Sequence, residues 1–479
     1  MTVPELVFQA ARQWPETIAV YENDDTTTYA ELSALILQVS QDLTKEGIGS
    51  GQCVGVLGGN SAEFIALAFA VMSTGAVVMP ISNQLKADEI ATIVDTAHLH
   101  AIVDDHTTEI SPLTEVKAII ETPKGSWRLC LNPMADPQKI FTPFVENPAL
   151  IRFTSGTTGA SKGVILSHQA ILERTEAANK ALQLRPGDTV VWVLQMAYHF
   201  VVSIILYLRY GATIAICDSF IADTIIETTR RHKGTFLYAS PLHIRMLAND
   251  KTDRSLDSLH TVISTSTAIS TADCNAFFNR YGKAVSQAYG IIEIGLPIIN
   301  LERSEVHPEA VGYALPDYEV EMLDDEWQPL PAGAIGHLAI KGPGMFDAYL
   351  APPRHRDEVL QNGWFLTGDL ASKKEDGLIT IEGRKKSMIN VSGNKVFPEE
   401  VEEVLNQHPA VAMSRVSGKP HAFLGECVTA EVIVKEGQAF EVESMITFCR
   451  QRLSTYKVPQ RITAVESLPM TDSGKLIRH

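Results

Sequence analysis

One ten-residue segment of the chain is unusually rich in groups that bind phosphate oxygens. Residues 154–163 read Thr-Ser-Gly-Thr-Thr-Gly-Ala-Ser-Lys-Gly and follow the apolar pair Leu150-Ile151. The hydroxyls, the ammonium of Lys162 and the accessible backbone amides can all donate to anionic oxygens. The segment is not a Walker loop, because Ser161 and Gly163 flank the lysine where that motif has Gly and then Ser or Thr. So many donors among flexible glycines predict a phosphate-binding loop rather than an ordinary surface loop.

Three further segments carry side chains suited to nucleotide chemistry. Gln-Ala-Tyr-Gly-Ile-Ile-Glu contains Tyr289, whose flat ring can cover a purine, and ends at Glu293, whose carboxylate is a hard ligand for Mg²⁺. Trp-Phe-Leu-Thr-Gly-Asp ends at Asp369, which offers two acceptor oxygens to a pair of hydroxyls. Pro-Met-Thr-Asp-Ser-Gly-Lys ends at Lys475, a mobile ammonium that can neutralise charge on a reacting phosphate. Taken singly, such residues are more often turn or surface residues, so their joint occurrence carries the argument.

In this order, the segments resemble the sequence blocks of the adenylate-forming superfamily. That superfamily includes acyl-CoA synthetases, aryl-acid ligases, peptide-synthetase adenylation domains and beetle luciferase. The resemblance begins at Ser-Gly-Thr-Thr-Gly-x-x-Lys-Gly and extends over most of the chain. It implies an acid–thiol ligase that uses ATP and Mg²⁺ to convert a carboxylic acid into an acyl-adenylate and pyrophosphate. The acyl group then passes to the thiol of coenzyme A, or to the phosphopantetheine of a carrier protein.

The resemblance also implies roles for individual residues. Lys475, Lys162 and Glu293 are the implied catalytic residues, and Glu293 is also the implied Mg²⁺ ligand. Lys386 occupies the hinge about which the small domain turns, and Gly393 lies where the pantetheine arm passes the backbone. The implied nucleotide-binding residues are Thr154, Ser155, Gly156, Thr157, Thr158, Gly159, Lys162, Tyr289, Gly290, Asp369, Arg384 and Lys475.

Three other segments are expected to form the acyl pocket. Residues 196–200 resemble the family segment that places an aromatic residue or a histidine at the pocket wall. They contain no Asp, which favours a fatty, aryl or other amine-free acid. Residues 264–268 replace a family Gly-Gly-Ala segment, so their side chains should narrow the pocket, and residues 291–296 should add an apolar wall. The predicted pocket residues are Tyr198, His199, Phe200, Thr265, Ser266, Ile291 and Ile292.

Ile292 departs from the family pattern, which usually has a phosphate-contacting threonine at this position. Three functions therefore remain open. The preferred one is a ligase that transfers the acyl group to coenzyme A. The alternatives are a stand-alone adenylating enzyme that loads a separate carrier protein, and a nucleotide-binding relative with impaired catalysis. The acid, the pathway and the oligomeric state are left open.

The elements that position these residues are expected to form an α/β fold. Up to about residue 385, helical patterns alternate with short β-branched runs, which predicts α/β layers with largely parallel sheets. The Asp376-Gly377 pair predicts a β-hairpin, and Pro398 predicts the start of a helix. We therefore expect a large N-terminal domain over 1–385, which includes a β-rich part, and a small mobile α+β C-terminal lid domain over 386–479.

Composition narrows the possible partners. The chain has 479 residues, with 40 Lys and Arg against 57 Asp and Glu, a formal net charge of −17 that opposes binding to nucleic acid or anionic membrane. Residues 64–81 are apolar, but Ser73-Thr74-Gly75 interrupts them, so we expect a buried helix, a turn and a buried strand rather than a membrane span.

The six cysteines lack metal-ligand spacing, and no targeting segment is evident at the N-terminus. Both observations lead us to expect a reduced, cytoplasmic protein.

Overall fold

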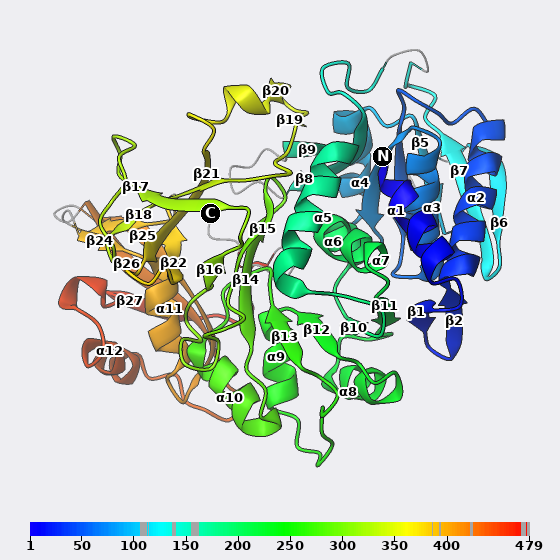
Figure 1. Ribbon diagram of the computed structural model, residues 1–479. Helices are drawn as coiled ribbons and strands as arrows, with labels where there is room; N and C mark the ends of the chain where they lie inside the picture. The colour runs from blue at the N-terminus through cyan, green and yellow to red at the C-terminus, as the bar shows by residue number, and fades with distance from the viewer. Residues whose placement is uncertain are drawn as a thin grey trace.

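The computed structural model describes residues 1–105, 113, 115–136, 140–154, 162–385, 387–391, 394–421, 425–470 and 476 (Figure 1). Over these residues the chain forms two nine-stranded mixed sheets, a four-stranded antiparallel sheet and a five-stranded sheet. The α/β fold class is therefore confirmed. The two nine-stranded sheets are parallel at their centres, and antiparallel strands are added at their edges.

The first nine-stranded sheet carries the segments that are predicted to line the acyl pocket. Its parallel centre runs from β1 through β11, β10, β12 and β13 to β14, and short antiparallel strands flank it on both sides. In spatial order the strands are β16 (Tyr313–Ala314), β15 (Gly295–Ile299), β14 (Ser286–Ile291), β13 (Thr261–Ser264), β12 (Phe236–Ala239), β10 (Thr189–Trp192), β11 (Thr213–Ile216), β1 (Ile18–Glu22) and β2 (Asp25–Thr28).

The second nine-stranded sheet contains the strands on either side of the predicted phosphate loop. Strands β8, β4, β3 and β5 are parallel, whereas β9 returns antiparallel to β8. In spatial order the strands are β20 (Arg354–His355), β19 (Ala348–Tyr349), β9 (Lys162–Ser167), β8 (Pro148–Thr154), β4 (Val77–Ser82), β3 (Cys53–Gly58), β5 (Ala101–Asp104), β7 (Gly125–Leu131) and β6 (Val116–Thr122).

Helices join the two large sheets through one shared core. Figure 1 shows α1, α2 and α3 (blue) side by side, and residues 62–72 of α3 are buried on every face because the helix is apolar all round. One hydrophobic cluster accordingly contains residues of both sheets, for example Val54 and Ile214. The helical segments of this part are α1 (Val3–Gln13), α2 (Tyr29–Lys45), α3 (Ala62–Ser73), α4 (Ala87–Ala97), α5 (His168–Leu182), α6 (Met196–His199), the π-helical turn η1 (Phe200–Ile205), α7 (Leu206–Arg209), α8 (Ala222–Arg231), α9 (Pro241–Ala248) and α10 (Thr271–Tyr281).

The expected interruption in the apolar stretch 64–81 is confirmed. Helix α3 ends at Ser73, Gly75 turns the chain with a φ of 86°, and β4 follows. No helix within the described residues is long and apolar enough to cross a membrane. All six cysteines are free and buried.

The β-rich part of the large domain is a four-stranded antiparallel sheet. The predicted hairpin is confirmed, since β21 and β22 pair antiparallel and Gly377 between them has a φ of 89°. The strands are β17 (Glu319–Leu323), β18 (Ile335–Lys341), β21 (Phe365–Lys373) and β22 (Ile379–Arg384), and the short helix η2 (Arg356–Glu358) precedes β21.

The last part of the chain folds around its own hydrophobic cluster. Helix α11 begins at Pro398, as predicted, with Glu399 and Glu400 in its first turn where they suit the helix dipole. It packs against β22, so this part lies beside the β-rich sheet, as Figure 1 shows in orange and red. Its elements are β23 (Ile389–Val391), β24 (Asn394–Val396), α11 (Pro398–Asn406), β25 (Val411–His421), β26 (Gly425–Val434), α12 (Val442–Arg450), η3 (Thr455–Lys457) and β27 (Arg461–Ala464).

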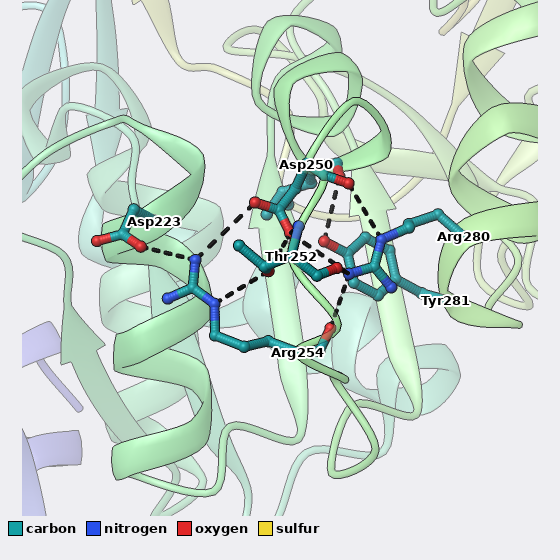
Figure 2. Close-up of polar contacts among 7 residues, drawn as sticks. Asp223, Asp250, Thr252, Arg254, Arg280 and Tyr281 are labelled. Atoms are coloured by element: carbon teal, nitrogen blue, oxygen red, sulfur yellow. Dashed lines mark hydrogen bonds and ion pairs between the residues drawn. The ribbon is translucent and has the colours of Figure 1, made fainter.

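A polar network fixes the connection from α9 to β13 (Figure 2). Arg280 Nη2 of α10 donates to Asp250 Oδ2 at 3.3 Å and to the carbonyl of Arg254 at 2.9 Å. Arg254 Nη2 in turn lies 2.6 Å from Asp223 Oδ1 of α8. Because β13 starts directly after this connection and ends at the predicted pocket segment, the network helps to hold that strand in register.

Candidate active site

The site lies where parallel strands of the first sheet end. Strands β10, β12, β13 and β14 point the same way, so the segments after them meet at one edge. Tyr238 at the end of β12 connects the segments that follow β10 and β13. Its ring stacks on Trp192 at 5.8 Å and meets the edge of His199 at 6.1 Å, and its hydroxyl lies 3.3 Å from Thr265 Oγ1. The acyl-pocket segments at 196–200 and 264–268 are thus brought together.

The individual pocket residues do not all face this edge. Tyr198 and His199 are half-buried, with His199 beside Tyr238 and Tyr198 beside Arg152. Phe200 is 2 % exposed and packs against Phe64 and Phe69 of α3, so it lies in the core. Successive residues of a helix point about 100° apart. Neighbouring residues of the segment therefore cannot all share one face.

The other predicted pocket residues lie on the loops after β13 and β14. Thr265 is buried, and Ser266 is half-buried with a φ of 77°. A serine therefore holds a left-handed conformation that glycine adopts without strain, and its side chain occupies space that a glycine would leave free. Ile291 and Ile292 are half-buried, whereas Ile294 and Leu296 are buried in the core.

Asp369 is the centre of the predicted ribose site. It is buried in the middle of β21, and Arg384 Nε on the neighbouring strand β22 donates to its Oδ1 at 2.8 Å. The hydroxyl of Tyr289 donates to the other oxygen, Oδ2, at 2.6 Å. Burial and the charge of Asp369 raise the pKa of Tyr289 well above its ordinary value, so the phenol stays protonated. Each carboxylate oxygen keeps a further lone pair for a ribose hydroxyl.

Gly290 directly follows Tyr289 and makes a close approach to the return strand. A Cβ atom at this position would lie 2.6 Å from the carbonyl oxygen of Gly295. Only glycine therefore fits, which explains the Tyr-Gly pair of the sequence in terms of backbone packing.

On the phosphate side, one tyrosine contacts both charged groups of the site. The Tyr349 hydroxyl donates to Glu293 Oε1 at 3.0 Å, and the Nζ of Lys162 lies 4.8 Å from the centre of the Tyr349 ring. Tyr349 comes from the short strand β19, which pairs with β9. The sequence analysis did not identify this residue, because nothing local links an isolated tyrosine to a lysine 187 positions earlier.

A buried arginine holds the two segments that carry Glu293 and Tyr349. Arg174 of α5 is fully buried, with Nη1 donating to the carbonyl of Ile292 and Nε to the carbonyl of Gly344, both at 2.8 Å. Its Nη2 also bonds to Gly344, and Glu173 accepts from the Gly344 amide at 2.9 Å. Burial lowers the pKa of Arg174 to about 10, so it remains charged at neutral pH. The sequence signal that could have identified Arg174 is a charged residue at a helix position where the periodic pattern places buried residues.

Glu293 fits the Mg²⁺ role that the sequence implied. It is half-buried, and the bond from Tyr349 occupies Oε1, while Oε2 makes no hydrogen bond within the described residues. Mg²⁺ commonly binds one or two carboxylates together with phosphate oxygens and water, so one carboxylate facing a phosphate site suits it.

Several predicted site residues lie outside the described residues. For Thr154 only the backbone, at the end of β8, is described. The others are Ser155, Gly156, Thr157, Thr158, Gly159, Lys386, Gly393 and Lys475. Their roles remain predictions from the sequence.

Comparison with known proteins places the whole chain in one family. The family model described as AMP-binding enzyme matches residues 7–350, and the AMP-binding enzyme C-terminal domain matches residues 400–475. The chain is 27 % identical to a long-chain-fatty-acid–CoA ligase of Escherichia coli O6:H1, over 90 % of this chain and 85 % of that protein. It is 26 % identical to a feruloyl-CoA synthase of an Amycolatopsis species, over 98 % and 96 % of the two chains.

The same relationship holds for solved structures. The structure of ATP-bound MatB from Rhodopseudomonas palustris matches with a TM-score of 0.87 and 26 % identity, covering 99 % of this chain and 97 % of that one. Motifs, fold and family matches agree. The chain belongs to the AMP-binding enzyme family, the adenylate-forming superfamily that its motifs resemble.

Proposed function

We propose that the protein uses ATP to activate an amine-free carboxylic acid as an acyl-adenylate and then transfers the acyl group to coenzyme A. One observation carries this proposal. Near the end of β14, Tyr289 contacts Asp369, and in the turn that follows this strand Glu293 contacts Tyr349, whose ring lies beside Lys162. The ribose end and the phosphate end of one nucleotide site are thereby joined by five consecutive residues.

The first half-reaction follows from this arrangement. An oxygen of the substrate carboxylate attacks the α-phosphorus of ATP, and the bond to the bridging oxygen of pyrophosphate breaks. Asp369 and Arg384 hold the ribose, while the ammonium of Lys162 offsets phosphate charge in the transition state. Glu293 would hold Mg²⁺, which supplies further charge neutralisation on the phosphate oxygens when it is bound.

In the second half-reaction the thiolate of coenzyme A attacks the acyl carbonyl, and AMP leaves with the bonding electron pair. The proposal includes the lid movement implied by the family resemblance: residues 386–479 turn about Lys386, Lys475 withdraws, and the thiol passes Gly393. Coenzyme A is supported as acceptor by the two relatives, whose names specify CoA thioesters. Both chemical halves then use one nucleotide pocket with two arrangements of the lid.

The acyl pocket favours an acid without an amino group. Its wall contains the rings of Tyr198, His199 and Tyr238, and Ser266 narrows it where the family has glycine. No Asp occurs in residues 196–200 to pair with a substrate ammonium.

The decisive experiment measures pyrophosphate release from ATP and Mg²⁺ with fatty, aryl and small aliphatic acids, followed by thioester formation with either coenzyme A or a holo-carrier protein. We expect pyrophosphate release with at least one acid and thioester formation with coenzyme A. Thioester formation with the holo-carrier protein alone would show that the acceptor is a carrier protein and not coenzyme A. Tight ATP binding without pyrophosphate release from any acid would instead identify a catalytically impaired relative, as the departure at Ile292 allows.

A further inference from the structure

A cation that forms no ion pair with any described residue lies on β8 beside the predicted acyl pocket. Arg152 stands two residues before Thr154 in the strand sequence Pro-Ala-Leu-Ile-Arg-Phe-Thr, on the strand face opposite to Ile151 and Phe153. Its guanidinium carbon lies 5.8 Å from the centre of the Tyr198 ring. The Nε atom is buried and has no hydrogen-bond partner.

The charge of Arg152 is poorly compensated by the protein itself. Within the part of the chain that the structure describes, its guanidinium makes no hydrogen bond or ion pair, and the groups that act on its charge are Tyr198, Tyr238 and Glu293. Burial lowers the pKa of Arg152 to about 10, so the side chain is still protonated at neutral pH. A half-buried guanidinium whose buried Nε has no acceptor is unfavourable unless a ligand supplies the missing acceptor.

Arg174 provides the contrast. Arg174 is a fully buried arginine near this site, and all three of its guanidinium nitrogens donate to backbone carbonyls. Its bonding explains its presence as part of the fold. Among the residues that the structure describes, no comparable partner explains Arg152, which indicates that its partner arrives with the substrates.

The side chains around Arg152 favour the acid over ATP as its partner, although Glu293 on the phosphate side also acts on its charge. Tyr198 and Tyr238, which face Arg152, belong to the acyl pocket through their contacts with His199 and Thr265. The phosphate side is served by Lys162, which lies over Tyr349 on another strand. A planar guanidinium also matches a carboxylate, to which it can donate two parallel hydrogen bonds.

We propose that Arg152 binds a carboxylate group of the acid substrate inside the acyl pocket. This inference rests on the proposed function and deepens it, because it adds a specificity-determining cation to a pocket expected to be apolar. The carboxylate is either the reacting group, held against the repulsion of the nearby phosphates, or the second carboxylate of a dicarboxylic acid. Both carboxylates would bind the guanidinium in the same way. They differ in whether every acid, or only a dicarboxylic acid, depends on Arg152.

The test compares wild type with Arg152→Gln and Arg152→Lys on monocarboxylic and dicarboxylic acids of equal length, such as butyrate with succinate and benzoate with phthalate. Loss of a charge-assisted hydrogen bond should raise the KM for the acid by roughly 10- to 100-fold in Arg152→Gln, with partial recovery in Arg152→Lys and the dissociation constant of ATP unchanged. An effect confined to dicarboxylic acids identifies the second carboxylate, and an effect on every acid identifies the reacting one.

A binding measurement separates this inference from the proposed function. Calorimetry with α,β-methylene-ATP, which cannot release pyrophosphate, reports acid binding without turnover. Weaker acid binding by Arg152→Gln supports the inference even if no turnover occurs. Equal binding by wild type and variant, binding of no acid by either protein, or an equal loss of ATP affinity overturns it. Pyrophosphate release that is absent in wild type counts against the proposed function instead.

A stability measurement excludes a merely structural role. If Arg152 is kept for a ligand, replacing its uncompensated charge by an apolar side chain of similar length in Arg152→Met should raise the unfolding midpoint of the ligand-free protein while weakening acid binding. A lowered midpoint together with unchanged acid binding would show that Arg152 serves the fold.

Discussion

The hydroxyl of Tyr349 donates to Glu293 Oε1 at 3.0 Å, while the Nζ of Lys162 lies 4.8 Å from the centre of the same ring. Tyr349 is 6 % exposed, and burial together with the charge of Glu293 raises its pKa well above the ordinary value. The phenol therefore remains protonated and always donates. It fixes Oε1 of Glu293 and leaves Oε2 without a hydrogen bond to the described residues.

Tyr349→Phe removes this hydrogen bond and keeps the ring beneath Lys162. A hydrogen bond to a charged group contributes about 1.5–3 kcal/mol, so we expect adenylation efficiency, measured as kcat/KM in pyrophosphate release, to fall roughly 10- to 100-fold. The concentration of Mg²⁺ needed for half-maximal rate should rise, because the carboxylate is less well oriented. Tyr349→Ala, which also removes the ring, is the matched variant and should be worse. Wild-type rates in Tyr349→Phe at limiting Mg²⁺ would contradict this role.

Asp369→Asn should weaken ATP binding without unfolding the protein. Asparagine keeps the shape but loses the charge that accepts from Arg384 Nε and Tyr289, and one of its two terminal groups can only donate. We expect the dissociation constant of ATP, measured by calorimetry, to rise roughly 10- to 100-fold while the unfolding midpoint changes little. Asp325→Asn, at an exposed ion pair with Lys385, is a control that should leave ATP affinity near wild type. The same modest effect in both variants would remove Asp369 from the ribose site.

Lys475→Ala should separate the two half-reactions. The proposed lid movement brings Lys475 to the α-phosphate in the first step only, so pyrophosphate release should be lost while thioester formation from synthetic acyl-adenylate continues. Both rates are measured on the same preparation with coenzyme A present. Equal loss of both steps would contradict the assignment of Lys475 to adenylation.

Arg174→Lys should destabilise the protein and impair the site together. Lysine cannot replace three guanidinium bonds to the carbonyls of Ile292 and Gly344, and the loss should cost about 2–4 kcal/mol in the free energy of unfolding. Arg231→Lys is the control, since the Arg231 side chain is 46 % exposed and pairs with Asp24 at the surface, and it should cost about 1 kcal/mol or less. Denaturant unfolding and pyrophosphate release provide the two measurements. Full activity in a destabilised Arg174→Lys would limit its role to the fold.

Two buried histidines should make the protein sensitive to mild acid. His168 and His243 are 9 % and 7 % exposed, and burial lowers the pKa of each from 6.5 to about 4. Below pH 6.5 the unfolded chain gains protons that the folded chain excludes. The free energy of unfolding should therefore fall as the pH decreases from 6.5 to 4, by up to about 1.4 kcal/mol per pH unit for each histidine.

Urea unfolding at pH 7 and pH 5 measures this dependence. In the double variant His168→Asn/His243→Asn, the difference in the free energy of unfolding between the two pH values should shrink. At position 168 the asparagine oxygen can replace the histidine nitrogen that accepts from the Val3 amide. An undiminished difference would assign the acid sensitivity to other groups.

Local sequence predicted some structural features correctly and others not. Gly377 and Pro398 each have a conformational preference that acts within a few residues, and both the hairpin and the start of α11 formed where predicted. The prediction for Phe200 was less successful because it assigned three consecutive residues to one pocket. The turn of the helix directs Phe200 into the core against Phe69 while His199 meets Tyr238.

The sequence by itself determined the family chemistry and the α/β class, and it predicts the residues of the ribose and phosphate segments, because each of these is recorded in a short run of neighbouring residues. The tertiary structure alone decided that Tyr349 contacts Glu293, that Arg174 holds both of their segments and that Arg152 lies beside Tyr198. These contacts join strands and helices far apart in the chain. Their partners are selected by how the two sheets pack, and no local pattern of residue types encodes that packing.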